Sequence, residues 1–555
     1  MKRLIPLLLC LVSVLRATTW YVDGALATGS NDGTSWPNAW KTLGAITGLA
    51  AGDTVYISGG SSGATLNYNI SSEFTSIPGF ISGTPGNPVT YKIGQDSAHN
   101  GTAIFNRITS GSQLLFGHSN YVFSGDAGDG QMHFSTSNYI SGFILNNDSN
   151  VRISYVNFGH IVQGGVINTA TGIELDHSYI YVTGVSTSTG FTAILLTGAT
   201  YGVNIFHHNI IYVPYDPTLN GNGSDGCQIG GDGWSLYNNT IVGYPLTGAN
   251  GNHQDGWQGS GGNFIKIYNN LIVDMANYGL FPEGYTVAKS YNHVKIYNNI
   301  ITSTRDNVSQ GMAISASGTF PITDFVCINN LVDRYTSGNP YTFRYPGGPA
   351  PGAFIDCFFE NNISVNSGSN VIDSTVNSVD NVSVSSGNAS IYFTDWTING
   401  GGANNYHLIA GASSLIGSAS DASSFIGNLD ADGVARIVPW DVGPYKYIAS
   451  ISAPLITLNP TSQSVVAGAN VTFNAMASGN PTPTWQWNKN ASPIGGATSA
   501  TLVLMNVSSG DAASYTATAT NTAGSATSST ATLAVTSPIP GPGSPGTPII
   551  TGVIP

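Results

Sequence analysis

Two segments of the chain carry the same pattern of polar side chains at a spacing of 30 residues. Residues 222–228 read NGSDGCQ and residues 252–258 read NHQDGWQ, so Asp225 matches Asp255 and Gln228 matches Gln258. If this spacing is one turn of a solenoid, the two aspartates stack in neighbouring coils about 5 Å apart. Two carboxylates at that distance repel, which raises one pKa or requires a cation between them. These residues are therefore candidates for chemistry.

Such a row of carboxylates has three interpretations. It can bind Ca²⁺ through Asp225 and Asp255, with Glu283 extending the row by one coil. It can act as the acid and nucleophile of a glycosidase, because these carboxylates lie about 5–5.5 Å apart in retaining enzymes. It can also cap turns, as Asp-Gly pairs often do. All three interpretations remain open from the sequence.

Two further residues flank Asp255. His253 and Trp257 are each two positions away and share its face if the segment is a strand. His253 then suits a catalytic base. An exposed Trp257 suits stacking on a sugar ring, and core packing is the alternative for this side chain. Gln228 and Gln258 are polar candidates for binding the same substrate.

Basic residues cluster just after this pair of segments. Lys266 and Lys295 occupy equivalent positions of the repeat, and Lys289 and Arg305 lie close by. A cationic strip beside an acidic one suits β-elimination, in which cations neutralise a uronate carboxylate while a base removes the adjacent C5 proton. His253 or Lys289 can be that base. Lys266, Lys295 and Arg305 can bind the substrate, and solvated surface charge is the alternative.

The repeat that positions these residues has a period near 30. An apolar-x-apolar-aromatic-Asn-Asn-apolar signature appears as SLYNNTI, KIYNNLI, KIYNNII, VCINNLV and FFENNIS, and His177 and His208 take the first Asn position in two earlier copies. The steps between copies are 31, 30, 31, 29, 31 and 32 residues, without helical periodicity. This pattern predicts a β-solenoid with a ladder of side chains from its first asparagines: Asn238, Asn269, Asn298, Asn329 and Asn361.

The two ends of the solenoid have their own signatures. SWPNAWKTLGAITGL at 35–49 predicts a capping helix with Trp40, Leu43 and Ile46 on one face. The opening YVDGALATGSNDGTSWPNAWKTL and AGDTVYISGG, with the closing segment 404–447, resembles secreted proteins of the pectin-lyase-like superfamily. This resemblance implies an all-β, right-handed parallel β-helix over 18–450. The arginine motif of pectate lyases and the NTD…DD…GHG…RIK set of polygalacturonase-like hydrolases are not found, so no family residue is carried over.

The chain changes character after residue 450. Residues 453–536 are similar to an immunoglobulin-like β-sandwich, with Trp487 at the position of the buried strand-C tryptophan and Tyr515 at the tyrosine corner. The usual disulfide positions are Ala475 and Ala517. The similarity implies a spacer, attachment or carbohydrate-binding role. Residues 537–555 form a Pro/Gly-rich linker or tail.

Composition narrows the classes of partner. The net charge of −13 argues against nucleic acid, and the 8% charged residues are far below the roughly 25% of an average protein. Residues 1–17 have the layout of a signal peptide, and no later apolar run reaches membrane-spanning length. Cys227, Cys327 and Cys357 then remain as buried core residues.

The residues together favour a secreted carbohydrate-active enzyme that cleaves glycosidic bonds of an extracellular polysaccharide. β-Elimination with Ca²⁺ is favoured slightly over hydrolysis by paired carboxylates. A non-catalytic adhesin or carbohydrate-binding surface protein is the alternative from another class. In each case the protein is expected to be a monomer.

Overall fold

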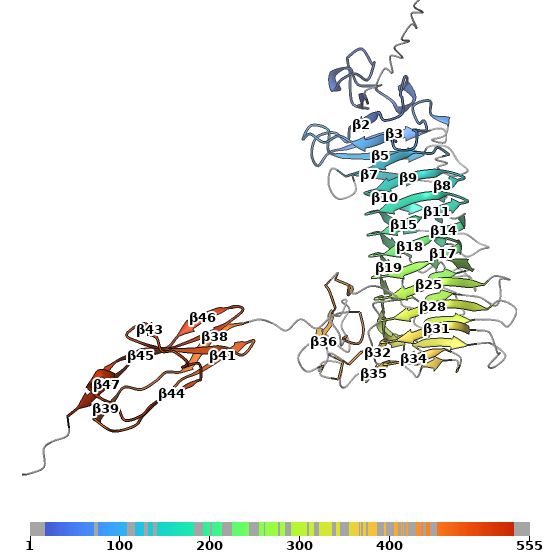
Figure 1. The fold of residues 1–555 in the computed structure, drawn as a ribbon. Helices are drawn as coiled ribbons and strands as arrows, with labels where there is room; N and C mark the ends of the chain where they lie inside the picture. The colour runs from blue at the N-terminus through green and yellow to red at the C-terminus, as the bar shows by residue number, and fades with distance from the viewer. Residues whose placement is uncertain are drawn as a thin grey trace, which may run out of the picture. The chain divides into compact units, whose positions relative to one another are not determined.

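The computed structural model describes two compact units, divided between Tyr447 and Ile448 (Figure 1). The described residues are 17–537 without 71–75, 108–116, 127–130, 137–140, 162, 183–191, 200–202, 214–224, 244–254, 260, 276–277, 283–289, 308–309, 316–320, 336–339, 345–353, 366, 368–369, 373, 375, 386–392, 396–404, 409–411, 413, 416–417, 420–428, 433, 437–439 and 445–451. The predicted signal peptide, His253, Glu283, Lys289 and the tail 538–555 lie outside them.

The N-terminal unit is a parallel β-helix with three long sheets. Sheet 1 is 14-stranded and contains, in order, β1 (Thr19–Val22), β2 (Thr54–Ile57), β4 (Val89–Ile93), β6 (Tyr121–Ser124), β9 (Ser149–Ser154), β12 (Thr171–Asp176), β15 (Asn204–His207), β18 (Trp234–Tyr237), β22 (Lys266–Tyr268), β25 (Tyr291–Tyr297), β28 (Ile322–Ile328), β31 (Phe354–Glu360) and β34 (Asn377–Val379), with β21 (Gly262–Asn263) beside β25.

Sheet 2 is 12-stranded and contains β3 (Thr65–Ile70), β5 (Thr102–Arg107), β7 (Met132–Thr136), β10 (Val156–Ile161), β13 (Tyr179–Val182), β16 (Ile210–Tyr212), β19 (Thr240–Val242), β23 (Leu271–Val273), β26 (Ile300–Asn307), β29 (Leu331–Tyr335), β32 (Ile363–Val365) and β35 (Val382–Val384). Sheet 3 is 9-stranded and contains β8 (Ser141–Asn146), β11 (Gln163–Asn168), β14 (Thr192–Ala199), β17 (Asp225–Gly231), β20 (Asp255–Gly259), β24 (Tyr278–Pro282), β27 (Gln310–Ser315), β30 (Tyr341–Arg344) and β33 (Val371–Ile372).

Alternate residues of each strand fill the interior of the β-helix. Leu175 of β12, Ile180 of β13 and Ile194 of β14 are at most 1% exposed and belong to one continuous apolar core. The three thiols belong to the buried residues as well, as predicted. Burial raises the pKa of Cys357 to about 12, so this thiol stays protonated. The predicted all-β fold class with long parallel sheets is confirmed.

The ladder of asparagines runs one residue later than the sequence predicted. Asn238 and its counterparts have positive φ angles of 54–57° and form the corner between sheets 1 and 2. The second asparagine of each pair points inward: the Nδ2 of Asn239 donates to Oδ1 of Asn270 at 3.0 Å, and Asn270 donates to Asn299 at 3.0 Å. Asparagine tolerates the left-handed corner, and the buried amide bonds to backbone of the preceding coil, as Asn270 does with the N–H of Asn239 and the carbonyl of Leu236.

The N-terminal end of the β-helix differs from the predicted capping helix. Two 3₁₀ turns, η1 (Trp36–Asn38) and η2 (Leu43–Ala45), flank an extended residue, Trp40, that bridges Val22. The three predicted apolar residues are still buried, because the Trp40 ring stacks on Trp20 and Ile46 is 0% exposed. Two glycines and β-branched residues in this segment weaken a continuous helix, so the apolar spacing was correct and the helix prediction was wrong.

Past the last coil, β36 (Phe393–Asp395) and β37 (Asn405–Leu408) pair antiparallel. The C-terminal unit contains β38 (Ser452–Leu458), β39 (Gln463–Val466), β40 (Val471–Asn474), β41 (Met476–Asn480), β42 (Thr484–Lys489), β43 (Ser492–Pro493), β44 (Thr501–Leu504), η4 (Ser509–Asp511), β45 (Ala513–Asn521), β46 (Gly524–Thr527) and β47 (Ala531–Thr536). Most of its strand pairs are antiparallel, and β39 pairs parallel with β47.

Two side chains give the C-terminal unit its character. Trp487 is 0% exposed and packs in one cluster with Phe473. The hydroxyl of Tyr515 donates to the backbone oxygen of Asp511 at 2.9 Å, which is the bond of a tyrosine corner. Ala475 and Ala517 are buried, so this core is closed by packing.

Candidate functional site

The predicted site on sheet 3 is stacked as expected, but its carboxylates bond to the strand backbone of the next coil. β17 and β20 pair in register with Gln228 opposite Gln258, and the two glutamine side chains hydrogen-bond at 3.2 Å. Asp225 accepts the backbone N–H of Asp255 at 3.0 Å, and Asp255 accepts the N–H of Tyr278 at 3.1 Å. The aspartates are 8% and 0% exposed, so each ties the start of its strand to the start of the strand in the next coil and is closed to a polysaccharide.

Two other assignments near this row are corrected. Trp257 is 1% exposed and belongs to the central core, so its ring cannot stack on a sugar in solvent. Its position in β20 explains this, because it pairs with two inward residues, Cys227 and Leu280. The residue that follows Asp255 in the row is Tyr278, not Glu283, since β24 begins 23 residues later and shortens the coil.

The structure brings two of the predicted basic residues together. Lys266 and Lys295 are paired in register on sheet 1, the first exposed and the second half-buried. Arg305 lies in β26 of sheet 2, and its side chain is outside the described part. The basic pair therefore stands on a different sheet from the aspartate row, and the two do not form one strip.

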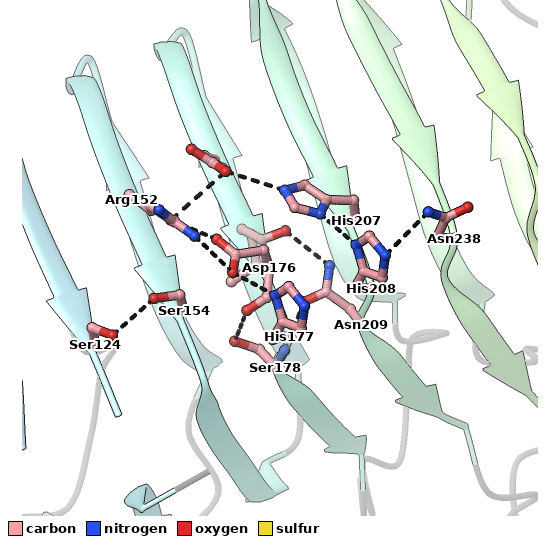
Figure 2. A network of polar contacts seen from close by, with 12 residues as sticks. Ser124, Arg152, Ser154, Asp176, His177, Ser178, His207, His208, Asn209 and Asn238 are labelled. Atoms are coloured by element: carbon pink, nitrogen blue, oxygen red, sulfur yellow. Dashed lines mark hydrogen bonds and ion pairs between the residues drawn. The ribbon is translucent and has the colours of Figure 1, made fainter. Parts of the chain in front are cut away.

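A second polar cluster lies at the corner between sheets 1 and 2, over β9, β12 and β15 (Figure 2). We call it the corner cluster, and its members are Arg152, Glu174, Asp176, His177, His207 and His208. Parallel pairing places Ser154, Asp176 and His207 in one row, with Arg152 and Glu174 in the row before it. His177 and His208 take the left-handed corner positions, with φ angles of 47° and 55°.

Asp176 is the anion on which the corner cluster is built. Its carboxylate is 0% exposed and accepts two bonds from Arg152, from Nε at 2.8 Å and from Nη2 at 3.2 Å. The Oδ1 atom of Asp176, which accepts the bond from Nη2, also lies 2.8 Å from Nδ1 of His177. These bonds raise the pKa of Arg152 further above its ordinary value, so the guanidinium is permanently charged. A buried carboxylate thus holds a cation on one side and an imidazole on the other.

Two more histidines form a hydrogen-bonded chain beside this anion. His207 Nε2 lies 3.1 Å from Oε1 of Glu174, and His207 Nδ1 lies 2.7 Å from Nδ1 of His208. The Nε2 of His208 lies 3.1 Å from the amide nitrogen of Asn238. With Glu174 ionised, His207 donates from Nε2, His208 donates from Nδ1, and Asn238 donates to the last ring nitrogen.

Stacking fixes the imidazole planes of the corner cluster. His177 stacks on His208 at 4.8 Å and on Tyr155 at 4.6 Å, and His207 stacks on Tyr237 at 4.8 Å. Burial lowers the pKa of His208, and the neighbouring His177 and His207 lower it further. A neutral His208 is therefore favoured.

Sequence reasoning placed these histidines in the structural repeat. The signal that marks them is their departure from it: His177 and His208 stand where later coils have asparagine, and Glu174 and Asp176 precede His177 in ELDH. Each residue appears ordinary in its own strand. Only the parallel register brings Arg152, from the preceding coil, onto Asp176.

A groove begins next to the corner cluster on sheet 2. It has a volume of about 520 Å³ and is lined by Ile104, His133, Phe134, Asn157, Gly159, Tyr179 and Tyr181. Tyr179 follows His177 by two residues, a chain distance of at most about 7 Å. Tyr179 is 36% exposed and stacks near Tyr181 with centroids 6.4 Å apart. The groove offers aromatic rings and polar groups to a ligand that also reaches the corner cluster.

Comparison with known proteins identifies the C-terminal unit. The family model for an immunoglobulin domain matches residues 453–521, which agrees with the buried tryptophan and the tyrosine corner. The search of curated proteins gave no match. No helix among the described residues has the length and apolar character needed to cross a membrane.

The similar solved structures cover a small part of the chain. Tandem Ig repeats of Dlar are 27% identical, with a TM-score of 0.15, over 15% of this chain and 49% of that chain. An I-band fragment of titin is 30% identical, with a TM-score of 0.15, over 15% of this chain and 33% of that chain. Sidekick-1 immunoglobulin domains are 25% identical, with a TM-score of 0.15, over 16% and 21%. The immunoglobulin-like assignment therefore rests on the family model and the local geometry.

Proposed function

We propose that the protein cleaves an acidic extracellular polysaccharide by β-elimination at the corner cluster. One observation carries this proposal: Arg152 and His177 bond to the same buried carboxylate of Asp176. A cation and a base held side by side are what removal of a proton next to a carboxylate requires. The extracellular location rests on the signal-like residues 1–17 and the resemblance to pectin-lyase-like proteins.

His177 is the base in this proposal. Asp176 accepts the hydrogen bond from Nδ1, which leaves the lone pair on Nε2 to take up a proton. The side chain is 36% exposed, so a substrate can reach it. The stack with Tyr155 and His208 holds the ring plane in place. In the reaction, Nε2 takes the C5 proton of a uronate ring.

Arg152 binds the carboxylate of that uronate. Its side chain is 44% exposed, and its Nη1 takes no part in either bond to Asp176. Charge neutralisation stabilises the carbanion character that develops at C5. The electron pair of the C5–H bond then forms the C4=C5 double bond. The C4–O bond breaks, and the departing oxygen takes a proton from solvent.

The groove on sheet 2 gives the glycan a path to this pair. Tyr179 and Asn157 lie two residues after His177 and Tyr155 on their coils, so the groove and the base belong to one surface. Exposed tyrosine rings suit the apolar faces of sugars, and Asn157 suits their hydroxyls.

Hydrolysis by paired carboxylates is less well supported. Asp176 has no exposed side-chain area and is committed to Arg152 and His177. Asp225 and Asp255 are buried and bond to strand backbone of the following coil. A carboxylate in these settings has no path to an anomeric carbon.

Non-catalytic glycan binding is the second candidate. The aromatic groove of sheet 2 supports it, because Tyr179 and Tyr181 can hold a sugar without any reaction at His177. The immunoglobulin-like unit is also common in proteins that act as spacers or binding modules.

The test is a panel of polyuronates assayed for unsaturated products by near-ultraviolet absorbance. We expect His177→Asn to lower kcat by about 10²–10⁴-fold, the usual size of a general-base contribution. His293→Asn is the matched control, because His293 also has a left-handed φ of 56° but pairs with Asp324, away from the cluster. Binding without product from the wild type supports the second candidate, and full activity of His177→Asn refutes the proposed base.

Calcium is tested in the same assay. The Asp225 and Asp255 carboxylates bond to backbone amides, and the predicted third ligand, Glu283, does not continue their row. We therefore expect product formation to persist in EGTA. If EGTA abolishes product formation and added Ca²⁺ restores it, calcium takes part in the mechanism.

A further inference from the structure

We infer that His177, His207 and His208 form a binding site for a divalent late transition-metal ion, with Zn²⁺ as the probe. One ligand atom from each of the three residues lies within 4.8 Å of the others. The closest pair is the two Nδ1 atoms of His207 and His208, at 2.7 Å. One proton lies between these two nitrogens, and a metal ion would replace it.

Side-chain rotation is needed to turn these distances into a coordination sphere. With Zn–N bonds of about 2.0–2.1 Å in a tetrahedron, ligand nitrogens are separated by about 3.3 Å. The two Nδ1 atoms of His207 and His208, 2.7 Å apart, must separate by about 0.6 Å, and the partly exposed ring of His177 must leave its stack on His208 to direct a nitrogen at the ion. Backbone register already places all three residues on adjacent coils. The fourth position is then open to water.

Carboxylates support two of these ligands from behind. Glu174 holds His207 through Nε2, and Asp176 holds His177 through Nδ1. Metal-binding histidines in proteins commonly have their second nitrogen bonded to a carboxylate, which fixes the tautomer and raises ligand basicity. His207 is also 9% exposed and stacked on Tyr237, so its direction is fixed by packing. This support distinguishes the cluster from a chance group of surface imidazoles.

The charge and the ligand type define the metal. Glu174 and Asp176 each bond to one of the imidazoles, so carboxylate charge lies behind two of the ligands and favours a bound cation. Imidazole nitrogens favour Zn²⁺, Co²⁺, Ni²⁺ and Cu²⁺, whereas Ca²⁺ prefers oxygen ligands. The site inferred here is thus different from the calcium site predicted from the aspartate row.

This inference goes beyond the proposed function and bears on its regulation. His177 cannot hold a metal ion and accept a C5 proton with the same nitrogen. If both assignments hold, a bound transition-metal ion inhibits cleavage, and a chelator increases it. That consequence rests on the proposed function, but metal binding itself does not.

The experiment is calorimetric titration of the full chain, without a histidine tag, with ZnCl₂ in the absence of substrate. We expect one equivalent to bind, and His177→Asn and His208→Asn each to weaken binding at least tenfold. Both substitutions place asparagine at left-handed corner positions, where Asn238 stands in the next coil, so the fold is expected to persist. Circular dichroism checks this.

His293→Asn is the control and is expected to bind Zn²⁺ like the wild type. Co²⁺ absorption reports nitrogen coordination, and excess Ca²⁺ is expected to leave Zn²⁺ affinity unchanged. The inference is overturned if the wild type binds no Zn²⁺, if both corner variants bind as the wild type does, or if Ca²⁺ competes. Because no substrate is present, these results on Zn²⁺ binding are independent of whether the cleavage proposal holds.

Discussion

The aspartate row of sheet 3 and the corner cluster of sheets 1 and 2 are both built by stacking polar residues in neighbouring coils, and they differ in what those residues contact. Asp225 and Asp255 accept amide protons of the following coil and are buried. Asp176 is equally buried, but it accepts its bonds from two side chains that reach solvent, Arg152 and His177. Whether a buried carboxylate is structural or supports a functional site therefore depends on which groups donate hydrogen bonds to it.

The difference lies in how each group relates to the repeat. Asp225 and Asp255 recur at the period of the coil, and each bonds to a backbone amide of the following coil. His177 and His208 stand at the corner position that the later coils fill with asparagine. In a solenoid, residues that recur in each coil are usually structural. Residues that depart from the repeat are better candidates for a functional site.

The largest expected effect concerns Trp257. Replacement by alanine removes a ring that is 1% exposed and is expected to lower the free energy of unfolding by about 3–5 kcal/mol, measured by denaturant titration. Trp257→Phe is the control, because the indole N–H has no acceptor among the described residues. A small loss in Trp257→Ala together with weaker sugar binding would restore the stacking interpretation.

Arg152→Met tests the other region. This change leaves the Asp176 carboxylate, which is 0% exposed, without its cation. Removing one partner of a buried ion pair costs about 3–5 kcal/mol. Because Arg152 is 44% exposed and His177 still donates, we expect about 2–3 kcal/mol, with loss of cleavage. Arg152→Lys keeps the charge, and retention of both properties in Arg152→Met would contradict the assigned role.

Asp255→Ala is expected to have a smaller effect and no specific effect on the reaction. The N–H of Tyr278 loses its acceptor, which costs about 1–3 kcal/mol in thermal or chemical unfolding. Asp255→Asn keeps an acceptor oxygen and should lose less. If folded Asp255→Ala has lost cleavage while keeping its melting temperature, the aspartate row is the active site and the corner cluster is not.

The smallest expected effect is on pH dependence. The folded chain holds the pKa of His208 below that of an ordinary imidazole through burial and the neighbouring His177 and His207, so the unfolded chain takes up the proton first as pH falls. This contribution to stability is present above about pH 6.5 and is lost at lower pH. Between pH 7.5 and 5.5, we expect His208→Asn to reduce the drop in melting temperature by about 1–2 °C. An unchanged or larger drop would contradict the assignment.

Much of the architecture could be predicted from local pattern. The steps of 29–32 residues gave the solenoid, the alternation of apolar residues gave its core, and Trp487 with Tyr515 gave the second unit. The candidate site was predicted poorly. Identical spacing showed that Asp225 and Asp255 stack, but it did not show that each carboxylate is buried and bonds to a backbone amide of the next coil.

The sequence by itself determined that the chain is a parallel solenoid followed by an immunoglobulin-like unit, because period, composition and turn residues are local properties that each coil repeats. The tertiary structure decided which polar residues face solvent and which residues from different coils meet. Arg152 and Asp176 are 24 residues apart, a spacing that matches no repeat, and a shorter coil between them brings their side chains to 2.8 Å. That contact depends on the register of the parallel strands. The register is set by the lengths of the folded coils, so it could not be read from the local pattern of the sequence.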